Sequence, residues 1–257
     1  MVNTEIAAVL VQHGEALFNA KPGHVVFTRD PAADALLNDL ELHPHAFVLA
    51  CIMDRQIKAE RAWLIPHLIS RKLGGFSFSL LHGLSLDDVR KLLTKPEPLH
   101  RFPEEMSRNF HAAVEHIANA YGGNASRIWR DKPPSAEVVL RFLQFRGVGP
   151  KIATMATNIL ARDFKVPLAD YYSVDVSADV HVRRVFRRLG LVSETAGLEE
   201  IIYCARALHP RFPGLLDFPA WEIGRTWCRR RNPDCAGCPI GAVCPRFIER
   251  AAGVRGS

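Results

Sequence analysis

Apolar residues recur three or four positions apart along most of the chain, which is the period of one face of an α-helix. The pattern is seen first at Phe47, Ala50, Cys51 and Met53, and again at Trp63, Leu64, His67 and Leu68. Alternation of apolar and polar residues, which is typical of strands, is nearly absent. The pattern therefore predicts an all-α protein.

Capping residues and helix breakers divide this pattern into helix-sized pieces. Helices are expected at 86–93, with Ser85 as the N-cap, at 107–121, and at 137–145, with Ser135 as a candidate cap. Breakers fall between them at Gly74-Gly75, Pro96 to Pro98, Gly122-Gly123 and Pro133-Pro134. No repeat of fixed period and no low-complexity tract is present.

Length and composition favour a folded, soluble protein. The 257 residues are 48% hydrophobic, which is enough for one large domain or two small ones. The longest apolar run, 46–53, is far shorter than the roughly 20 residues that span a bilayer, so no membrane insertion is expected. The opening Met-Val-Asn-Thr-Glu-Ile lacks the basic and apolar segments of a signal peptide, which indicates a reducing compartment.

The positive charge is clustered. The net charge is +6, and the excess lies in two groups of arginines: Arg183, Arg184, Arg187 and Arg188, then Arg225, Arg229, Arg230 and Arg231. Clusters of this kind are typical of surfaces that face a polyanion, although a merely solvated face is the ordinary alternative for any single run.

Four cysteines beside the second arginine group indicate a metal centre. Cys228, Cys235, Cys238 and Cys244 have the spacing C-x6-C-x2-C-x5-C within 17 residues. Structural zinc sites usually use two C-x2-4-C pairs, so this spacing favours an iron-sulfur cluster, with zinc as the alternative. Disulfides are disfavoured because they would need an oxidising compartment. Two further cysteines, Cys51 and Cys204, lie in apolar surroundings and are predicted to be inert core thiols.

The segment 137–160 predicts two helices joined by a tight hairpin at Gly147-Val148-Gly149. Two glycines allow a sharp turn, and Pro150 suits the first position of the second helix. The free N–H groups at that helix start favour an anion, and on a basic protein the expected anion is a DNA phosphate. An ordinary helix C-cap glycine is the alternative.

Two residues at predicted helix starts carry candidate chemistry. Lys151 lies in the first turn of its helix, where the dipole disfavours a cation and favours the neutral amine that a nucleophile needs. A lysine that holds a phosphate is the alternative. Asp179 is the expected N-cap of the helix whose apolar side carries Val182, Val185, Phe186 and Leu189, and capping alone would explain it.

Taken together, the motifs resemble the helix-hairpin-helix DNA glycosylase superfamily, and within it the endonuclease III branch. Three features match in the same order: the hairpin from Gly147 to Lys151, the segment Ala178-Asp179-Val180-His181-Val182, and the cysteine spacing. The resemblance covers about residues 40–245, tightly from Phe142 onward and loosely before it.

The resemblance implies roles for several residues. Lys151 would attack the anomeric carbon of a damaged nucleotide, and Asp179 would assist cleavage of the glycosidic bond. Gln56 would fill the gap left by the flipped base. Contacts with DNA would come from Gly147, Val148, Gly149, His181, Arg229 and Arg230, and the four cysteines from Cys228 to Cys244 would hold a [4Fe-4S] cluster.

The chain also departs from the family pattern. Lys151 and Asp179 are 28 residues apart, about ten more than in the family, and the added stretch 170–175 makes Asp175 a rival for the carboxylate role. The family's Ser-x-Gln-x-x-Asp becomes Asp54-Arg55-Gln56-Ile57-Lys58-Ala59, so its second acidic residue is missing. The residues of the base-binding pocket cannot be carried across from the family, so the resemblance does not imply which damaged base is preferred.

The resemblance implies two helical lobes: a helical barrel domain at 38–165 with the hairpin, and a discontinuous iron-sulfur domain at 1–37 and 166–257. We expect a glycosylase that excises a damaged base from duplex DNA and also acts as an AP lyase on abasic sites. A monofunctional glycosylase for uracil, mismatched thymine or an alkylated base is the alternative, followed by a non-enzymatic iron-sulfur DNA-binding protein. The protein is expected to be a monomer in the cytoplasm, associated with the nucleoid.

Overall fold

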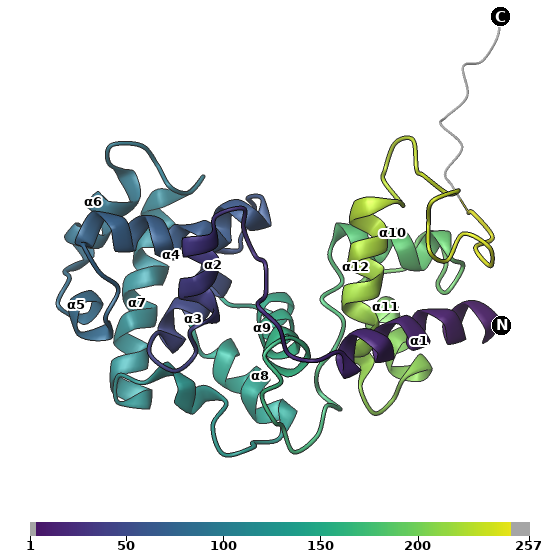
Figure 1. Ribbon diagram of the computed structural model, residues 1–257, viewed down its shortest axis with the longest axis horizontal. Helices are drawn as coiled ribbons and strands as arrows, with labels where there is room; N and C mark the ends of the chain where they lie inside the picture. The colour runs from purple at the N-terminus through teal and green to yellow at the C-terminus, as the bar shows by residue number, and fades with distance from the viewer. Residues whose placement is uncertain (1–3, 248–257) are drawn as a thin grey trace, which may run out of the picture. The chain divides into compact units, whose positions relative to one another are not determined.

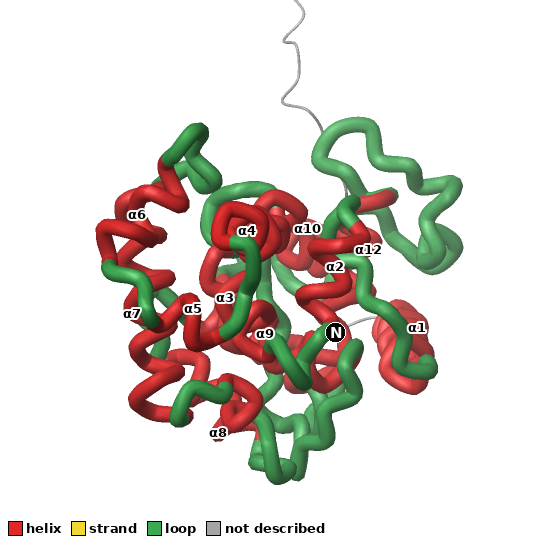
Figure 2. Tube along the Cα trace, turned by 60° about the vertical axis from the view of Figure 1, so that its left-hand side comes forward, coloured by secondary structure: helices red, strands yellow, loops and turns green. Residues whose placement is uncertain are grey.

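The computed structural model describes residues 4–247, and within them the chain is built from helices and loops, with no strand (Figure 2). The all-α prediction is therefore confirmed. The elements are α1 (Thr4–Asn19), α2 (Pro31–Asn38), α3 (Pro44–Met53), α4 (Ala59–Leu73), α5 (Phe78–His82), α6 (Leu86–Thr94), α7 (Pro103–Tyr121), η1 (Ala125–Ile128), α8 (Ser135–Leu143), α9 (Pro150–Arg162), α10 (Val180–Arg188), α11 (Leu198–Leu208), η2 (Pro213–Leu216) and α12 (Asp217–Thr226).

The chain divides into two compact units. The middle unit is Lys21–Ala169, and the discontinuous unit combines the residues up to Ala20 with those from Asp170 onward. In Figure 1 the purple helix α1 accordingly lies among the green and yellow helices of the discontinuous unit. The expected boundaries at 38 and 165 differ from these, chiefly because residues 21–37 belong to the middle unit.

Contacts explain why residues 21–37 join the middle unit. Phe27 stacks on Trp63 of α4, with ring centroids 4.5 Å apart. Asn38 at the end of α2 binds both the N–H and the carbonyl of Val25, at 2.8 and 2.9 Å. Buried Asp34 accepts from the N–H and the hydroxyl of Thr28. The segment before α2 is thus fixed to the helices that follow it.

Helix α3 is the centre of the middle unit because every one of its residues is buried. Phe47 contacts the rings of Trp63, Trp129 and Phe164, which come from three other parts of the unit. Cys51 is fully buried, as expected for an inert core thiol. In residues 4–247 no helix combines the length and apolar composition needed to cross a bilayer.

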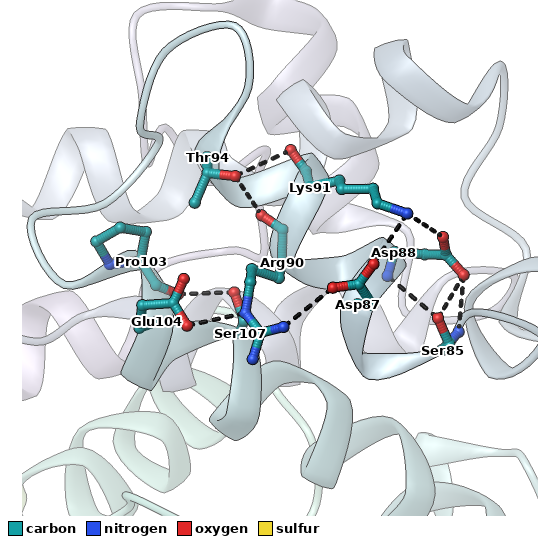
Figure 3. Close-up of polar contacts among 9 residues, drawn as sticks. All are labelled: Ser85, Asp87, Asp88, Arg90, Lys91, Thr94, Pro103, Glu104 and Ser107. Carbon is teal, nitrogen blue, oxygen red and sulfur yellow. Dashed lines mark hydrogen bonds and ion pairs between the residues drawn. The ribbon is translucent and has the colours of Figure 1, made fainter.

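Helices α6 and α7 show how local sequence sets an element. Ser85 and Asp88 form a capping box at the start of α6, which confirms the predicted cap (Figure 3). Arg90 then joins Asp87 of its own helix, at 3.0 Å, to Glu104 of α7, at 2.8 Å. Ser135 differs from the prediction: it is the first residue of α8, and Pro134 occupies the cap position.

The discontinuous unit has its own apolar core. Ile6 and Leu10 of α1 are buried with Val182 and Phe186 of α10 and Ile223 of α12. The predicted apolar side of α10 is therefore confirmed. Burying each such side chain contributes about 1.5–3 kcal/mol to stability, so α1 is an integral part of this unit.

Candidate functional site

The predicted helix, hairpin and helix are present as α8, a turn and α9. Gly147 has φ +81°, a left-handed conformation that residues with a Cβ rarely adopt. Gly149 is the N-cap of α9 and Pro150 its first residue, so no side chain caps the free N–H groups of the first turn. These groups, together with the positive end of the helix dipole, form a surface that suits an anion.

Lys151 is exposed in the first turn of α9, directly after this hairpin. The amine therefore lies beside the proposed anion site and is accessible within its own unit. Val148 and Gly149 are half-buried, so of the hairpin's middle residues Gly147 is the most exposed.

The loop between α3 and α4 presents Gln56 at the surface. Gln56 is exposed and has φ +54°, which is uncommon for a residue with a side chain. Such strain persists where the surroundings hold it and is frequent at ligand-contacting sites. The contact role that the resemblance implies for Gln56 stays a prediction.

Arg101 and Phe102, in the loop between α6 and α7, were missed from the sequence. The Arg101 guanidinium lies over the Phe102 ring at 5.2 Å, and 36% of Phe102 remains exposed. Exposed aromatic rings are one kind of surface on which nucleobases stack. The signal that would have found it is an Arg-Phe pair immediately before Pro103, which starts α7.

Asp179 is the N-cap of α10, as predicted. Its Oδ1 accepts hydrogen bonds from the N–H groups of His181 and Val182, at 2.8 and 2.9 Å. The chain leading into this cap is itself held, because the N–H of Ser177 donates to buried Asp217 at 2.6 Å. The carboxylate is half-exposed and its position is fixed from both sides.

The rival carboxylate, Asp175, is engaged elsewhere. Arg206 donates to both of its oxygens at 2.8 Å, and only 14% of the Asp175 side chain is exposed. Tyr171 is anchored as well, since its ring packs against the rings of Phe18 and Phe212, which also contact each other. The added stretch is therefore a fixed strap against α1, α11 and η2.

His181 connects the Asp179 cap to the cysteine loop. Its Nδ1 lies 3.0 Å from Nη2 of Arg184, and Arg184 donates to the carbonyls of Cys228 and Gly224 at 2.7 and 2.6 Å. Gly224 packs so closely on His181 that a Cβ there would lie 2.9 Å from the histidine's own Cβ. His181 thus supports an internal network instead of projecting freely.

Three of the four α10 arginines predicted to face a polyanion point into the protein. Arg184 donates to the Cys228 and Gly224 carbonyls. Arg187 donates to the Ala196 carbonyl at 2.6 Å, and Arg188 is only 6% exposed. Arg188 donates to the carbonyls of Arg229 and Arg230 at 2.8 and 3.2 Å. The prediction is wrong for Arg184 and Arg188 because the cysteine loop covers their face of α10, and for Arg187 because it binds the loop that precedes α11. Arg229 and Arg230 themselves remain exposed.

The four predicted ligand cysteines are brought together. All six cysteines of the chain are free, and one cavity against α10 and α12 is lined by Cys228, Cys235, Cys238 and Cys244. Burial, followed by the neighbouring thiols, raises the pKa of Cys238. Within residues 4–247 no set of three or more His, Cys, Asp or Glu side chains is already closed around a single metal position.

The loop's backbone is shaped around this cavity. A Cβ at Gly241 would clash with the carbonyls of Cys235 and Cys238. Only glycine therefore allows these segments of the loop to approach each other so closely. The donor nitrogen of Arg188 lies 3.5 Å from Cys228 Sγ. Four thiols and a buried cation on one cavity form a donor set that fits an anionic thiolate centre.

The proposed nucleophile and the proposed carboxylate belong to different units. Lys151, the hairpin and Gln56 lie in the middle unit, whereas Asp179, His181 and the cysteine loop lie in the discontinuous unit.

No protein-family model matches the sequence, and no curated protein matches it significantly. Solved structures do match. A trapped covalent complex of endonuclease III with DNA has a TM-score of 0.63 at 17% identity and covers 95% of this chain and 97% of that one. A thermostable thymine-DNA glycosylase has a TM-score of 0.62 at 15% identity and covers 94% and 96%.

A third match is the Clostridium acetobutylicum 8-oxoguanine glycosylase/lyase bound to double-stranded DNA that contains cytosine opposite 8-oxoguanine. Its TM-score is 0.54 at 17% identity, and the alignment covers 76% of this chain and 67% of that one. At these identities the likeness establishes the fold. The all-helical architecture expected from the resemblance is therefore confirmed.

Proposed function

We propose that this protein is a DNA glycosylase of base excision repair that also acts as an AP lyase. The observation that carries the proposal is the placement of Lys151: an accessible amine in the first turn of α9, directly after an uncapped glycine hairpin, in a fold shared with glycosylases along nearly its whole length. The partner is double-stranded DNA containing a damaged base or an abasic site.

The middle unit supplies three of the proposed contacts with DNA. The N–H groups at the start of α9 bind a backbone phosphate without reading the base sequence. Gln56 enters the space vacated by the flipped nucleotide, and the exposed Phe102 ring offers a stacking surface. In the discontinuous unit, the exposed Arg229 and Arg230 add phosphate contacts. Arg184, Arg187 and Arg188 of α10 cannot make such contacts because they bind carbonyls of the protein.

The proposed chemistry uses Lys151 and Asp179 in the roles that the resemblance implies for them. The Lys151 nitrogen donates its electron pair to C1' of the damaged nucleotide as the bond from C1' to the base breaks, and the base leaves with that bond's electron pair. Asp179, a carboxylate held by two N–H donors, stabilises the positive charge that develops on the sugar. The lysine nitrogen then loses a proton, and the C1'–O4' bond breaks as O4' keeps its electron pair and takes up a proton, which gives a Schiff base at C1'. Loss of a proton from C2' forms the C2'–C3' double bond, and the 3'-phosphate leaves with the electron pair of its bond to C3'.

We propose further that Cys228, Cys235, Cys238 and Cys244 hold a [4Fe-4S] cluster. When bound, the cluster would cross-link the loop between α12 and the end of the described chain and so fix Arg229 and Arg230. The four thiols on one cavity support this proposal. Iron and sulfide analysis tests it, with absorbance near 400 nm as the expected signature, whereas stoichiometric zinc in a colourless protein would contradict it.

The test of function is a panel of duplexes that each carry one defined lesion or an abasic site. We expect base release from at least one lesion, and borohydride reduction should trap a covalent adduct with the wild-type protein. Lys151→Gln should abolish the adduct, and Asp179→Asn should slow base release.

The outcomes of this panel separate the alternatives. Base release without any adduct, retained in Lys151→Gln, would show a monofunctional enzyme in which Lys151 holds a phosphate. No base release from any lesion by the cluster-loaded protein would refute the glycosylase proposal.

A further inference from the structure

Asn109 and Ser107 are buried polar residues of α7, and the Ser107 hydroxyl donates to the Pro103 carbonyl of the same helix. Met106, Phe110 and Ala113 around Asn109 are at most 1% exposed, and Asn109 itself is 1% exposed. Placing an amide in such surroundings costs free energy unless it is hydrogen-bonded. The Asn109 Nδ2 donates to the Met106 sulfur of the same helix at 3.7 Å, and the amide oxygen still needs a donor.

That donor belongs to the hairpin. Arg146, the residue before Gly147, donates from Nε to Asn109 Oδ1 at 3.1 Å. The Asn109 side chain also lies directly against Gly147, because a Cβ added to Gly147 would be 2.5 Å from Asn109 Nδ2. The buried amide therefore supports the hairpin at two consecutive residues.

A second side chain meets the hairpin at the same point. Nη1 of Arg55 would lie 2.9 Å from the added Cβ of Gly147, and the same nitrogen is 3.3 Å from Glu105 Oε1. Arg55 is the residue immediately before Gln56. The loop between α3 and α4 thus reaches the hairpin through its own arginine.

Helix α7 carries both supports on one face. Glu105 and Asn109 are four residues apart, so their side chains are neighbours on the helix surface. Glu105 holds the Gln56 loop through Arg55, and Asn109 holds the hairpin through Arg146. The side chains of Arg55 and Asn109 both lie within 3.0 Å of the position that a Cβ of Gly147 would occupy. Helix α7 therefore supports both loops at the same point.

We infer that Asn109 is a positioning residue that, with Glu105, makes α7 a bridge between the anion-binding hairpin and the Gln56 loop. The bridge keeps the phosphate grip and the gap-filling side chain at a fixed spacing. The inference rests on the proposed function for what the two loops bind, but the bridge itself is a property of the free protein.

The first experiment measures amide hydrogen exchange without DNA. Asn109→Ala should speed exchange at 146–149 and at 54–58 by tenfold or more, because the hydrogen bond that holds Arg146 to α7 is lost. Asn109→Asp keeps the acceptor for Arg146 and should restore slow exchange at 146–149. Asn109→Leu fills the space without an acceptor and should behave like the Ala variant, which provides a second route if Asn109→Ala folds poorly.

A matched control is Asn38→Ala. Asn38 also anchors backbone through its amide, at Val25, but touches neither loop. It should destabilise the protein without changing exchange at 146–149. If Asn109→Ala and Asn109→Leu leave exchange at both loops unchanged, or alter it no more than Asn38→Ala does, the bridge does not exist.

The second experiment measures function. For a duplex with a tetrahydrofuran abasic analogue, Asn109→Ala should weaken Kd by about tenfold, while the single-turnover rate of base release at saturating DNA changes less than threefold. An equal loss in Asn38→Ala would overturn the positioning role. Failure of the wild-type protein to bind this duplex would refute the proposed function instead, and the exchange experiment would still decide on the bridge.

Discussion

Asp175 and Asp179 carry the same carboxylate four positions apart, yet their surroundings differ in kind. Both carboxylate oxygens of Asp175 accept hydrogen bonds from Arg206. In Asp179 one oxygen accepts from the N–H groups at the start of α10, and the residue stays half-exposed. Sequence register favours Asp179, but it cannot exclude Asp175, because Arg206 is 31 residues away and its approach is a product of the fold.

Substitution should separate these two carboxylates. Asp179→Asn should slow base release at saturating DNA by about 10²-fold or more, because charge stabilisation in the transition state is lost. Asp175→Asn should stay within a few fold of wild type, with a small loss of stability. Single-turnover assays and urea unfolding of both variants measure this, and the opposite order would make Asp175 the reacting carboxylate.

His45 is a second residue whose behaviour follows from burial. It is 2% exposed, its Nε2 lies 2.7 Å from the Phe76 carbonyl, and desolvation lowers its pKa from 6.5 to about 4. Below pH 6.5 the unfolded chain takes up a proton that the folded His45 does not accept until about pH 4. Stability due to this residue is thus complete above pH 7 and falls as the pH drops through this window.

The expected loss between pH 6.5 and pH 4 is of the order of 3 kcal/mol. His45→Phe removes the titration at a cost of about 1 kcal/mol at pH 7, where the Phe76 carbonyl loses its donor. The measurement is the difference in unfolding free energy between the two proteins at each pH, which cancels the shared carboxylates. A difference that does not change with pH would contradict the assignment.

At the level of elements, periodicity and capping predicted helices well where both signals are local. Ser85 with Asp88, and Gly147 to Pro150, lie within a few residues of the boundaries they set. The arginines of α10 show the limit of this reasoning. Their spacing reveals that they share a helix, but only the packing of the cysteine loop decides that Arg184 and Arg188 face inward.

This division of the arginines predicts two different phenotypes. Arg230→Ala should weaken binding to undamaged duplex and reduce the slope of log K against log salt by about 1, with stability unchanged. Arg188→Ala should instead lower the iron content and the melting temperature, because the carbonyls of Arg229 and Arg230 lose their donor. Salt titrations and iron analysis of both variants provide the check, and an equal salt slope in both would contradict the assignment.

At the scale of the whole molecule, the core of the discontinuous unit is built from two chain segments, one that precedes the middle unit in the sequence and one that follows it. Two-lobe organisation was predictable from the resemblance, but the assignment of residues 21–37 was not, because it depends on Phe27 reaching Trp63. The consequence is that a change near residue 10 should be felt in residues 180–226 and not in the middle unit.

Leu10→Ala tests this organisation. Leu10 is fully buried with α10 and α12, so its truncation should cost about 2–5 kcal/mol. Hydrogen exchange should accelerate in α10, α11 and α12 and remain slow in α3 and α7. Leu49→Ala, in the centre of α3, should give the reverse map, and a uniform response to either variant would mean that the two units unfold as one.

The placement of α1 also has a consequence for synthesis. Its apolar stripe, Ile6 and Leu10, leaves the ribosome before any of the middle unit, but the side chains that cover it are translated more than 150 residues later. During that interval the middle unit can collapse on its own, while α1 remains a nascent amphipathic segment with an uncovered face. Exposed apolar segments of this kind are prone to aggregate, and the yield of native protein should therefore depend on how long translation of the last third takes.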